Sequence, residues 1–194
     1  MAIENLVFPG RFQPMTLGHV DVVKKICHDF DPRKIVLAFP KNIERTMENP
    51  FLSDETRKII ELSTEKLFPV DTIGIEIEGN LQKMWIRYIR DNRIDLVVSG
   101  NPDMVNVING IGQTTTRAMC INDGSVSQIR ASDVRGRMRI GDMSWRNLMV
   151  SEAVNYAESL KINWAELPIR RKRWYESETR VGVEPTYTVL QTAV

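Results

Sequence analysis

Residues 6–19 read LVFPGRFQPMTLGH, and they join an apolar run to the start of a helix. The apolar residues Leu6–Phe8 end at a Pro-Gly pair, which indicates a short strand followed by a turn. From about Gly18 onward, apolar residues recur at helical spacing as far as Phe30. A strand that turns directly into a helix is the opening unit of an α/β protein.

The same alternation continues along the chain. Further strands are predicted at 35–39, 72–77, 95–100 and 118–121, and helices at 53–67, 83–91, 132–140 and 151–160. Strands and helices that alternate at this spacing form right-handed βαβ units around a parallel sheet. The sequence therefore predicts a doubly wound α/β domain over residues 1–165, with helices at its C-terminal end. In such sheets, ligands bind beyond the carboxyl ends of the strands.

Composition limits the classes of function. The 194 residues include 26 Lys and Arg and 25 Asp and Glu, for a net charge of +1. Because no global basic field exists, general nucleic-acid binding is not expected, and any anion site must be local. The sequence predicts no signal peptide and no membrane span. Cys27 and Cys120 lack metal-ligand spacing and fit free thiols in a reducing cytoplasm.

The character of the sequence changes after Leu160. A basic run, PIRRKRW, occupies residues 168–174, and residues 176–194 show no helical face. We expect residues 166–194 to form a basic, flexible C-terminal tail. The alternatives are a tail that contacts nucleic acid or a partner, and a gene-fusion remnant.

The loop after the first strand has the chemistry of an anion site. Gly10 permits a tight turn, and Gly18 lets a ring or phosphate approach the backbone closely. His19 lies in the first turn of the helix, where free N–H groups favour an anion, and Arg11 adds a permanent cation. No acid–base pair accompanies them, which points to phosphoryl or nucleotidyl transfer. Thr-x-Gly-His also occurs by chance, so its position after the first strand carries the interpretation.

A second anion corner is predicted late in the chain. Residues 129–138 read IRASDVRGRM, which places Ser132 at a helix N-cap and Arg135 three residues further on. The hydroxyl, the helix amides and the guanidinium are suited to a polyphosphate. The alternative is an ordinary capped helix with solvated arginines.

Together the two corners resemble the HxGH nucleotidyltransferase superfamily, which has (H/T)-x-G-H after its first strand and an ISxTxxR-type motif late in the chain. Within it, GRFQP at 10–14 resembles the archaeal-type nicotinamide-mononucleotide (NMN) adenylyltransferases, as do TMENPF at 46–51 and SGNP at 99–102. The resemblance covers residues 5–160 and implies a Rossmann-like sheet of the nucleotidyltransferase type. Thr16 replaces the histidine usual in the archaeal group, and Arg130 replaces a serine.

The resemblance implies a reaction as well as a fold. The enzyme would transfer AMP from ATP to NMN by direct in-line attack, giving NAD and pyrophosphate. Mg²⁺ or another divalent metal would accompany ATP, held mainly by its phosphates and by no protein ligand. The implied catalytic residues are Arg11, Thr16, His19 and Arg135. The implied ATP-binding residues are Gly10, Arg11, Phe12, Gly18, His19, Ser132 and Arg135.

Four residues are implied to bind the acceptor. Trp85 would stack on the nicotinamide ring, or else be a core tryptophan. Asn80 would bond the carboxamide, and Asn101 would bind at a strand end or merely cap Pro102. Arg45 would meet a phosphate, or else be a solvated loop arginine.

Two other readings remain open at this stage. The first keeps the enzyme class but changes the acceptor to phosphopantetheine, flavin mononucleotide or a cytidylyl-transfer substrate. The second is a nucleotide-binding regulatory protein without turnover. The resemblance also implies assembly into a homo-oligomer.

Overall fold

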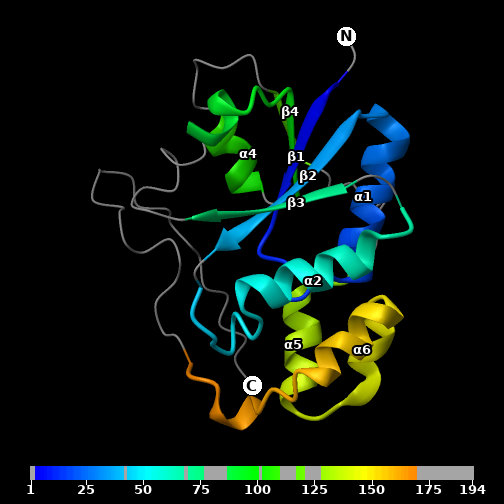
Figure 1. Cartoon of the computed structure of the whole chain (residues 1–194), viewed down its shortest axis with the longest axis vertical. Helices are drawn as coiled ribbons and strands as arrows, with labels where there is room; N and C mark the ends of the chain where they lie inside the picture. The colour runs from blue at the N-terminus through cyan, green and yellow to red at the C-terminus, as the bar shows by residue number, and fades with distance from the viewer. Residues whose placement is uncertain are drawn as a thin grey trace, which may run out of the picture.

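The computed structural model describes residues 3–41, 43–67, 70–76, 87–100, 102–109, 117–120 and 128–169 (Figure 1). The strands are β1 (Asn5–Pro9), β2 (Lys34–Lys41), β3 (Val70–Glu76), β4 (Leu96–Ser99) and β5 (Arg117–Cys120). The helices are α1 (Leu17–Phe30), α2 (Ser53–Thr64), α4 (Pro102–Asn109), α5 (Ala131–Arg139) and α6 (Ser151–Ser159). Two 3-10 helices, η1 (Met143–Leu148) and η2 (Trp164–Glu166), flank α6, and residues 87–91 are also helical.

The five strands form one sheet in the order β3-β2-β1-β4-β5, and each neighbouring pair is parallel. The chain winds outward from β1 in one direction and then returns to place β4 on the other side of it. This arrangement confirms the predicted doubly wound α/β fold. The strand order reverses between β1 and β4, which is where sheets of this kind bind ligands.

Alternate strand residues bury the two faces of the sheet in separate cores. Leu6 and Phe8 of β1 belong to the larger core, which α1, α2, α5 and α6 complete. Val7 points the other way and packs with Ile89 and Ile108, from the 87–91 helix and α4. The alternation follows from the period of two in a β-strand, and full burial of both faces explains why the strands are apolar runs.

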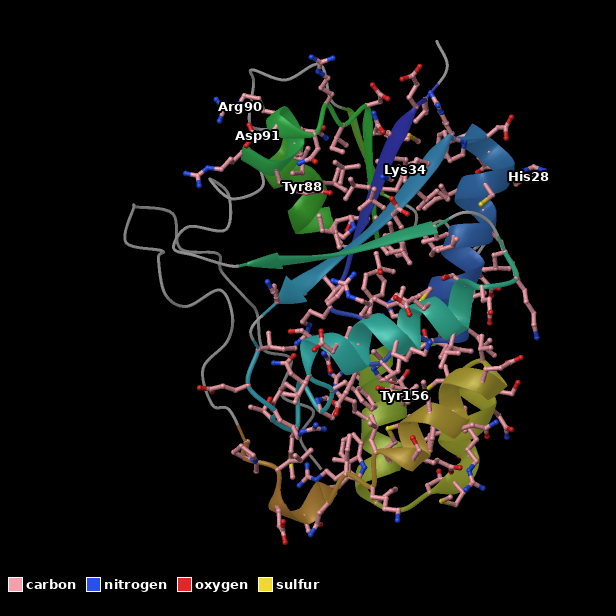
Figure 2. All side chains as sticks on the ribbon, viewed as in Figure 1. His28, Lys34, Tyr88, Arg90, Asp91 and Tyr156 are labelled. Atoms are coloured by element: carbon pink, nitrogen blue, oxygen red, sulfur yellow. The ribbon has the colours of Figure 1, made fainter. Side chains whose placement is uncertain are left out.

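The helices α5 and α6 lie below the sheet in Figure 1, where α6 packs against α2 and α5 packs against the two 3-10 helices. Tyr156 lies where α6 meets α2, and Figure 2 labels it at that junction. Burial raises the pKa of Tyr156, and the acidic first turn of α2, with Asp54 and Glu55, raises it further. Lys66 and Glu152 form an exposed ion pair of 2.6 Å at the same junction. Because exposed pairs contribute little, apolar burial is what holds these helices in place.

The second histidine lies far from the loop after β1. His28 is in the last turn of α1, with its side chain 88% exposed and paired with Asp29 at 2.8 Å (Figure 2). None of the described helices has the length and apolar character that crossing a membrane requires.

Candidate active site

The loop after β1 begins with a close approach between Gly10 and Phe12. A Cβ at Gly10 would lie 2.7 Å from the Phe12 ring, so a side chain there would displace the ring. This contact, rather than the tight turn expected from the sequence, explains the glycine. Phe12 is 1% exposed, and its ring meets Phe8 edge-on at 5.5 Å and His19 at 5.2 Å. Phe12 therefore packs against the imidazole of His19, and its predicted contact with ATP stays a prediction.

Thr16 and His19 form a reciprocal cap at the start of α1. The backbone N–H of Thr16 donates to Nδ1 of His19 at 3.0 Å, and the N–H of His19 donates to the Thr16 hydroxyl at 3.4 Å. Histidine here takes the place that glutamate or glutamine has in an ordinary capping box. Because a backbone N–H can only donate, we infer from this bond that Nδ1 is the acceptor and that Nε2 carries the hydrogen of the neutral ring; the Thr16 hydroxyl also lies 2.9 Å from Nδ1.

Burial keeps the His19 ring neutral. It lowers the pKa of His19 from its usual 6.5 to about 4. At neutral pH, the ring is therefore an uncharged imidazole whose Nε2–H is oriented by the bonds at Nδ1. Such a group can donate one hydrogen bond to a phosphate oxygen, and it cannot act as a base through Nδ1 while the cap is intact.

The second predicted corner meets the first. The Thr16 hydroxyl donates to the carbonyl of Ile129 at 3.2 Å, and Nη1 of Arg135 donates to the carbonyl of Gln13 at 2.6 Å. The first bond joins the loop after β1 to the segment before α5, and the second joins it to α5 itself. The structure thus links the Thr16–His19 cap and Arg135 through the loop after β1, and their predicted roles in catalysis and ATP binding stay predictions.

The prediction for Ser132 needs a correction. The helix begins at Ala131, the N-cap is Arg130, and no side chain caps this end. Ser132 is therefore the second residue of the helix, and its exposed hydroxyl donates to Oδ1 of Asp133 at 3.4 Å. Its predicted role as an ATP ligand stays a prediction.

The corner carries concentrated positive charge. Burial and, to a smaller extent, the positive charge of nearby Arg11 lower the pKa of Arg135 to about 10, although the charges of Glu48 and Asp133 act in the opposite direction. Arg135 remains a cation at neutral pH, so two guanidiniums lie in one corner despite their repulsion. An anionic ligand would relieve that repulsion.

Sequence reasoning missed the role of Gln13. Its side chain is 1% exposed, and its Nε2 donates to the carbonyl of Phe51 and to the Thr56 hydroxyl, each at 2.8 Å. Its Oε1 accepts from the N–H of Phe51 at 3.0 Å. Gln13 thereby fastens the loop after β2 to the loop after β1. The sequence held one sign of this contact: the GRFQP and NPF motifs, which contain Gln13 and Phe51, both belong to the resemblance to the NMN adenylyltransferases.

The structure describes only one of the four predicted acceptor residues, Arg45. Trp85, Asn80 and Asn101 lie outside the described residues. Arg45 donates to the carbonyl of Pro50 at 2.7 Å and pairs with Glu55 at 2.6 Å, which ties its loop to α2. A phosphate contact by Arg45 would have to replace or share that pair, and it stays a prediction. Gly18 is buried in the first turn of α1.

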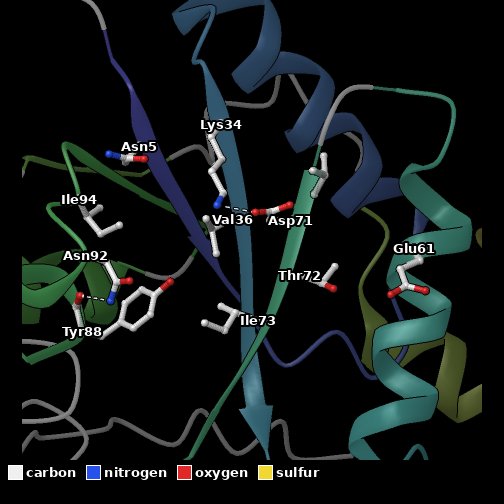
Figure 3. Close-up of a pocket in the computed structure, with 11 residues that line it drawn as sticks. Asn5, Lys34, Val36, Glu61, Asp71, Thr72, Ile73, Tyr88, Asn92 and Ile94 are labelled. Atoms are coloured by element: carbon white, nitrogen blue, oxygen red, sulfur yellow. Dashed lines mark hydrogen bonds and ion pairs between the residues drawn. The ribbon is translucent and has the colours of Figure 1, made fainter.

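A cavity of about 520 Å³ lies at the other end of the sheet. Figure 3 shows Asn5, Lys34 and Tyr88 among its lining residues, with the ion pair of Lys34 and Asp71 crossing it at 2.5 Å. Asn5 and Lys34 open β1 and β2, so the cavity faces the amino ends of these strands. It is therefore separate from the corner after β1. Within the described part of the chain, no three acidic, histidine or cysteine side chains form a metal-binding group.

The parallel sheet and the cationic corner after β1 define a nucleotide-binding protein of the nucleotidyltransferase class. The chain belongs to the cytidylyltransferase-like family, whose model matches residues 7–137. This membership confirms the predicted superfamily and the prediction of a nucleotidyltransferase enzyme.

Three relatives illustrate the range of similarity. A nicotinamide-nucleotide adenylyltransferase of Sulfurisphaera tokodaii is 27% identical over 161 residues, which cover 80% of this chain and 91% of that protein. A phosphopantetheine adenylyltransferase of Natranaerobius thermophilus is 28% identical over 99 residues, or 50% of this chain and 54% of that one. The solved structure of a bifunctional NMN adenylyltransferase/ADP-ribose pyrophosphatase from Francisella tularensis, complexed with AMP and manganese, is similar with a TM-score of 0.63 and 15% identity. That match covers 84% of this chain, which spans only half of the bifunctional protein.

Proposed function

We propose that this enzyme transfers AMP from ATP to NMN, giving NAD and pyrophosphate. The observation that carries the proposal is the corner beyond β1, where hydrogen bonds join the Thr16–His19 cap and Arg135 to one loop and where Arg11 lies close enough to affect the pKa of Arg135. Relatives named nicotinamide-nucleotide adenylyltransferase, which match most of the chain, support the choice of acceptor. The substrate ATP is taken as its complex with a divalent metal, in keeping with the manganese and AMP of the structural neighbour.

The proposed reaction is an in-line displacement. An oxygen of the acceptor 5′-phosphate forms a bond to the α-phosphorus of ATP. As it forms, the bond to the oxygen that bridges to the β-phosphate breaks, and the electron pair leaves with pyrophosphate. The attacking phosphate is already an anion, so the step needs no general base. The protein must instead bring two anions together and stabilise the charge that develops between them.

Each residue of the corner has a distinct part in this proposal. His19 donates from Nε2 to an oxygen of the α-phosphate, and Arg11 and Arg135 bind the β- and γ-phosphates. Thr16 acts through His19, because its backbone N–H fixes the ring and the proton on it. Ser132 assists at the start of α5. Backbone at Gly10 and Gly18 leaves room for the nucleotide.

The acceptor side rests on the resemblance. Trp85 would stack on the cationic nicotinamide ring, a contact worth ~1–2 kcal/mol. Asn80 would form a hydrogen bond with the carboxamide of this ring. Asn101 would also bind the acceptor, and Arg45 would contact a phosphate. One observation favours a second candidate, phosphopantetheine adenylyl transfer, because a relative of that name matches half of the chain. The two candidates share the ATP corner and differ only in the acceptor.

One assay separates the candidates. The protein is incubated with ATP, Mg²⁺ and either NMN or phosphopantetheine, and pyrophosphate and the adenylylated product are both measured. We expect NAD from NMN. Product from phosphopantetheine alone would replace the proposed acceptor, and ATP binding without turnover on either would contradict the enzyme assignment. Mass measurement in solution tests the further proposal that the protein is a homo-oligomer.

A further inference from the structure

The chain returns to the active-site corner after α6. Leu167 follows η2 directly and is buried, with 8% of its surface exposed, although the sequence places it in the tail. The carbonyl of Pro168 accepts from the backbone N–H of Met47 at 3.1 Å. Figure 1 shows this C-terminal segment beside the loop that follows β2. We call residues 164–168 the C-terminal strap.

The strap is bonded to a small turn in that loop. Within the turn, the N–H of Thr46 donates to the carbonyl of Asn49 at 3.0 Å, and the N–H of Asn49 donates to the Thr46 hydroxyl at 3.1 Å. Glu48 of this turn lies close enough to Arg135 to affect its pKa. The turn at 46–50 therefore lies near the cationic corner.

The same turn is attached to the loop after β1. Phe51 follows it and exchanges hydrogen bonds with the Gln13 side chain, while the Gln13 carbonyl accepts from Arg135. The strap also contacts α5, the helix that carries Arg135, through η2. It thus touches two of the elements that place the guanidinium.

One polar side chain of the turn, that of Asn49, has no hydrogen-bond partner. Asn49 is 1% exposed, and neither Oδ1 nor Nδ2 of its side chain has a hydrogen-bond partner. A buried amide without partners is unfavourable, so the turn needs restraint from outside to keep this conformation. Gln13 supplies that restraint on one side and the Pro168 carbonyl on the other.

We propose that the C-terminal strap is a positioning element of the nucleotide site, which holds the 46–50 turn against Arg135 in the geometry that binds the ATP phosphates. The inference rests on the proposed function for its ligand. Burial of Leu167 fixes the strap to the domain, and the hydrogen bond from the Met47 N–H to the Pro168 carbonyl fixes the turn to the strap. The enzyme domain accordingly extends through Pro168.

The test uses full-length variants and the dissociation constant of ATP, measured by calorimetry without acceptor. Leu167→Ala should raise that constant five- to tenfold at a temperature where the variant is fully folded, and Leu167→Met should restore it. Ile169→Ala is the matched control, because Ile169 is an apolar side chain in the same segment with 61% exposure. An unchanged ATP affinity in folded Leu167→Ala would overturn the proposal, even if its Tm fell.

Two shortened chains separate the strap from the residues beyond it. A chain ending at Ile169 should bind ATP as the parent does, and a chain ending at Asn163 should bind it at least as weakly as Leu167→Ala. Equal loss in both would assign the effect to residues 170–194 and contradict the role of the strap. Because ATP binding is read without turnover, absence of NAD formation would refute the proposed acceptor and leave this test intact.

If the altered chains do not fold, the parent protein carries the test. The bond to Pro168 predicts slow hydrogen exchange at the Met47 amide, and bound ATP should slow it further. Fast exchange at Met47 that ATP does not change would overturn the proposal.

Discussion

Arg135 donates through Nη1 to the backbone carbonyl of Gln13 at 2.6 Å, across 122 positions of sequence. The bond uses one of five guanidinium N–H groups, which leaves the rest of the fork for a ligand. Because the partner is a backbone carbonyl, this bond does not neutralise the charge of the guanidinium. The contact holds α5 against the loop after β1 and sets where the charge lies.

Removal of the His19 ring should abolish most turnover and leave the fold intact. We expect His19→Ala to lower kcat by ~10²–10³-fold, as loss of one preorganised donor does in other enzymes. Steady-state kinetics with NMN provide the measurement, and His28→Ala, at the exposed histidine, is the control. Retention of most turnover would remove His19 from the mechanism.

The Thr16 cap should affect both stability and catalysis. Thr16→Ala deletes the hydroxyl that accepts from His19 and donates to Ile129, and loss of an N-cap costs ~1 kcal/mol of unfolding free energy. We expect a roughly tenfold lower kcat as well, because the imidazole is less well fixed. Thr16→Ser keeps the hydroxyl and should recover both properties. If Ser fails where Ala fails, the methyl group and not the cap is what matters.

Stability should depend on pH through His19. Its folded pKa of about 4 lies below its usual 6.5, so the unfolded chain binds a proton between these values and the folded chain does not. The free energy of unfolding should therefore be greatest above pH 6.5 and fall as the pH drops toward 4. Denaturation at pH 7 and pH 5 measures the slope, which should be smaller in His19→Asn. An equal slope in both proteins would contradict the lowered pKa of His19.

Gly10 and Gly136 should respond oppositely to alanine. At Gly10 the new Cβ would meet the Phe12 ring at 2.7 Å, and the displaced ring would tilt His19, so we expect at least tenfold loss of kcat. At Gly136, in α5, nothing lies within 4 Å of the new Cβ. Alanine there should stabilise the helix by ~0.5–1 kcal/mol with activity unchanged. Thermal unfolding and steady-state kinetics of both variants test these expectations. A fully active Gly10→Ala variant would refute the role of the Phe12 contact.

The sequence predicted those parts of the site that are local in the chain. Thr16 and His19 are three residues apart at a strand–helix junction, so their meeting follows from the helix start alone. The side-chain contacts of Gln13 with Phe51 span 38 positions and depend on how two loops pack, which no short pattern records. These contacts become visible only once the sheet has placed the two loops side by side.

Two errors have physical causes. Serine is a residue type favoured at the N-cap, which is why the sequence suggested Ser132. In the structure, however, Arg130 has the extended backbone that precedes the helix, with φ −99° and ψ 145°. Cap preference is a tendency that packing of the preceding segment overrides. Leu167 stands alone between polar residues and a proline, so periodicity gave no sign that it is buried. A single apolar residue anchors a segment only when the fold offers a surface for it.

The central claim is that Arg11 and Arg135 bind the triphosphate of ATP beside His19. The most direct measurement is the dissociation constant of ATP for the parent, for each arginine-to-alanine variant and for the double variant, with exposed Arg139→Ala as control. We predict at least tenfold weaker binding for each single variant, a further loss for the double variant, and no change for the control. ATP affinity that survives removal of both guanidiniums would contradict the account.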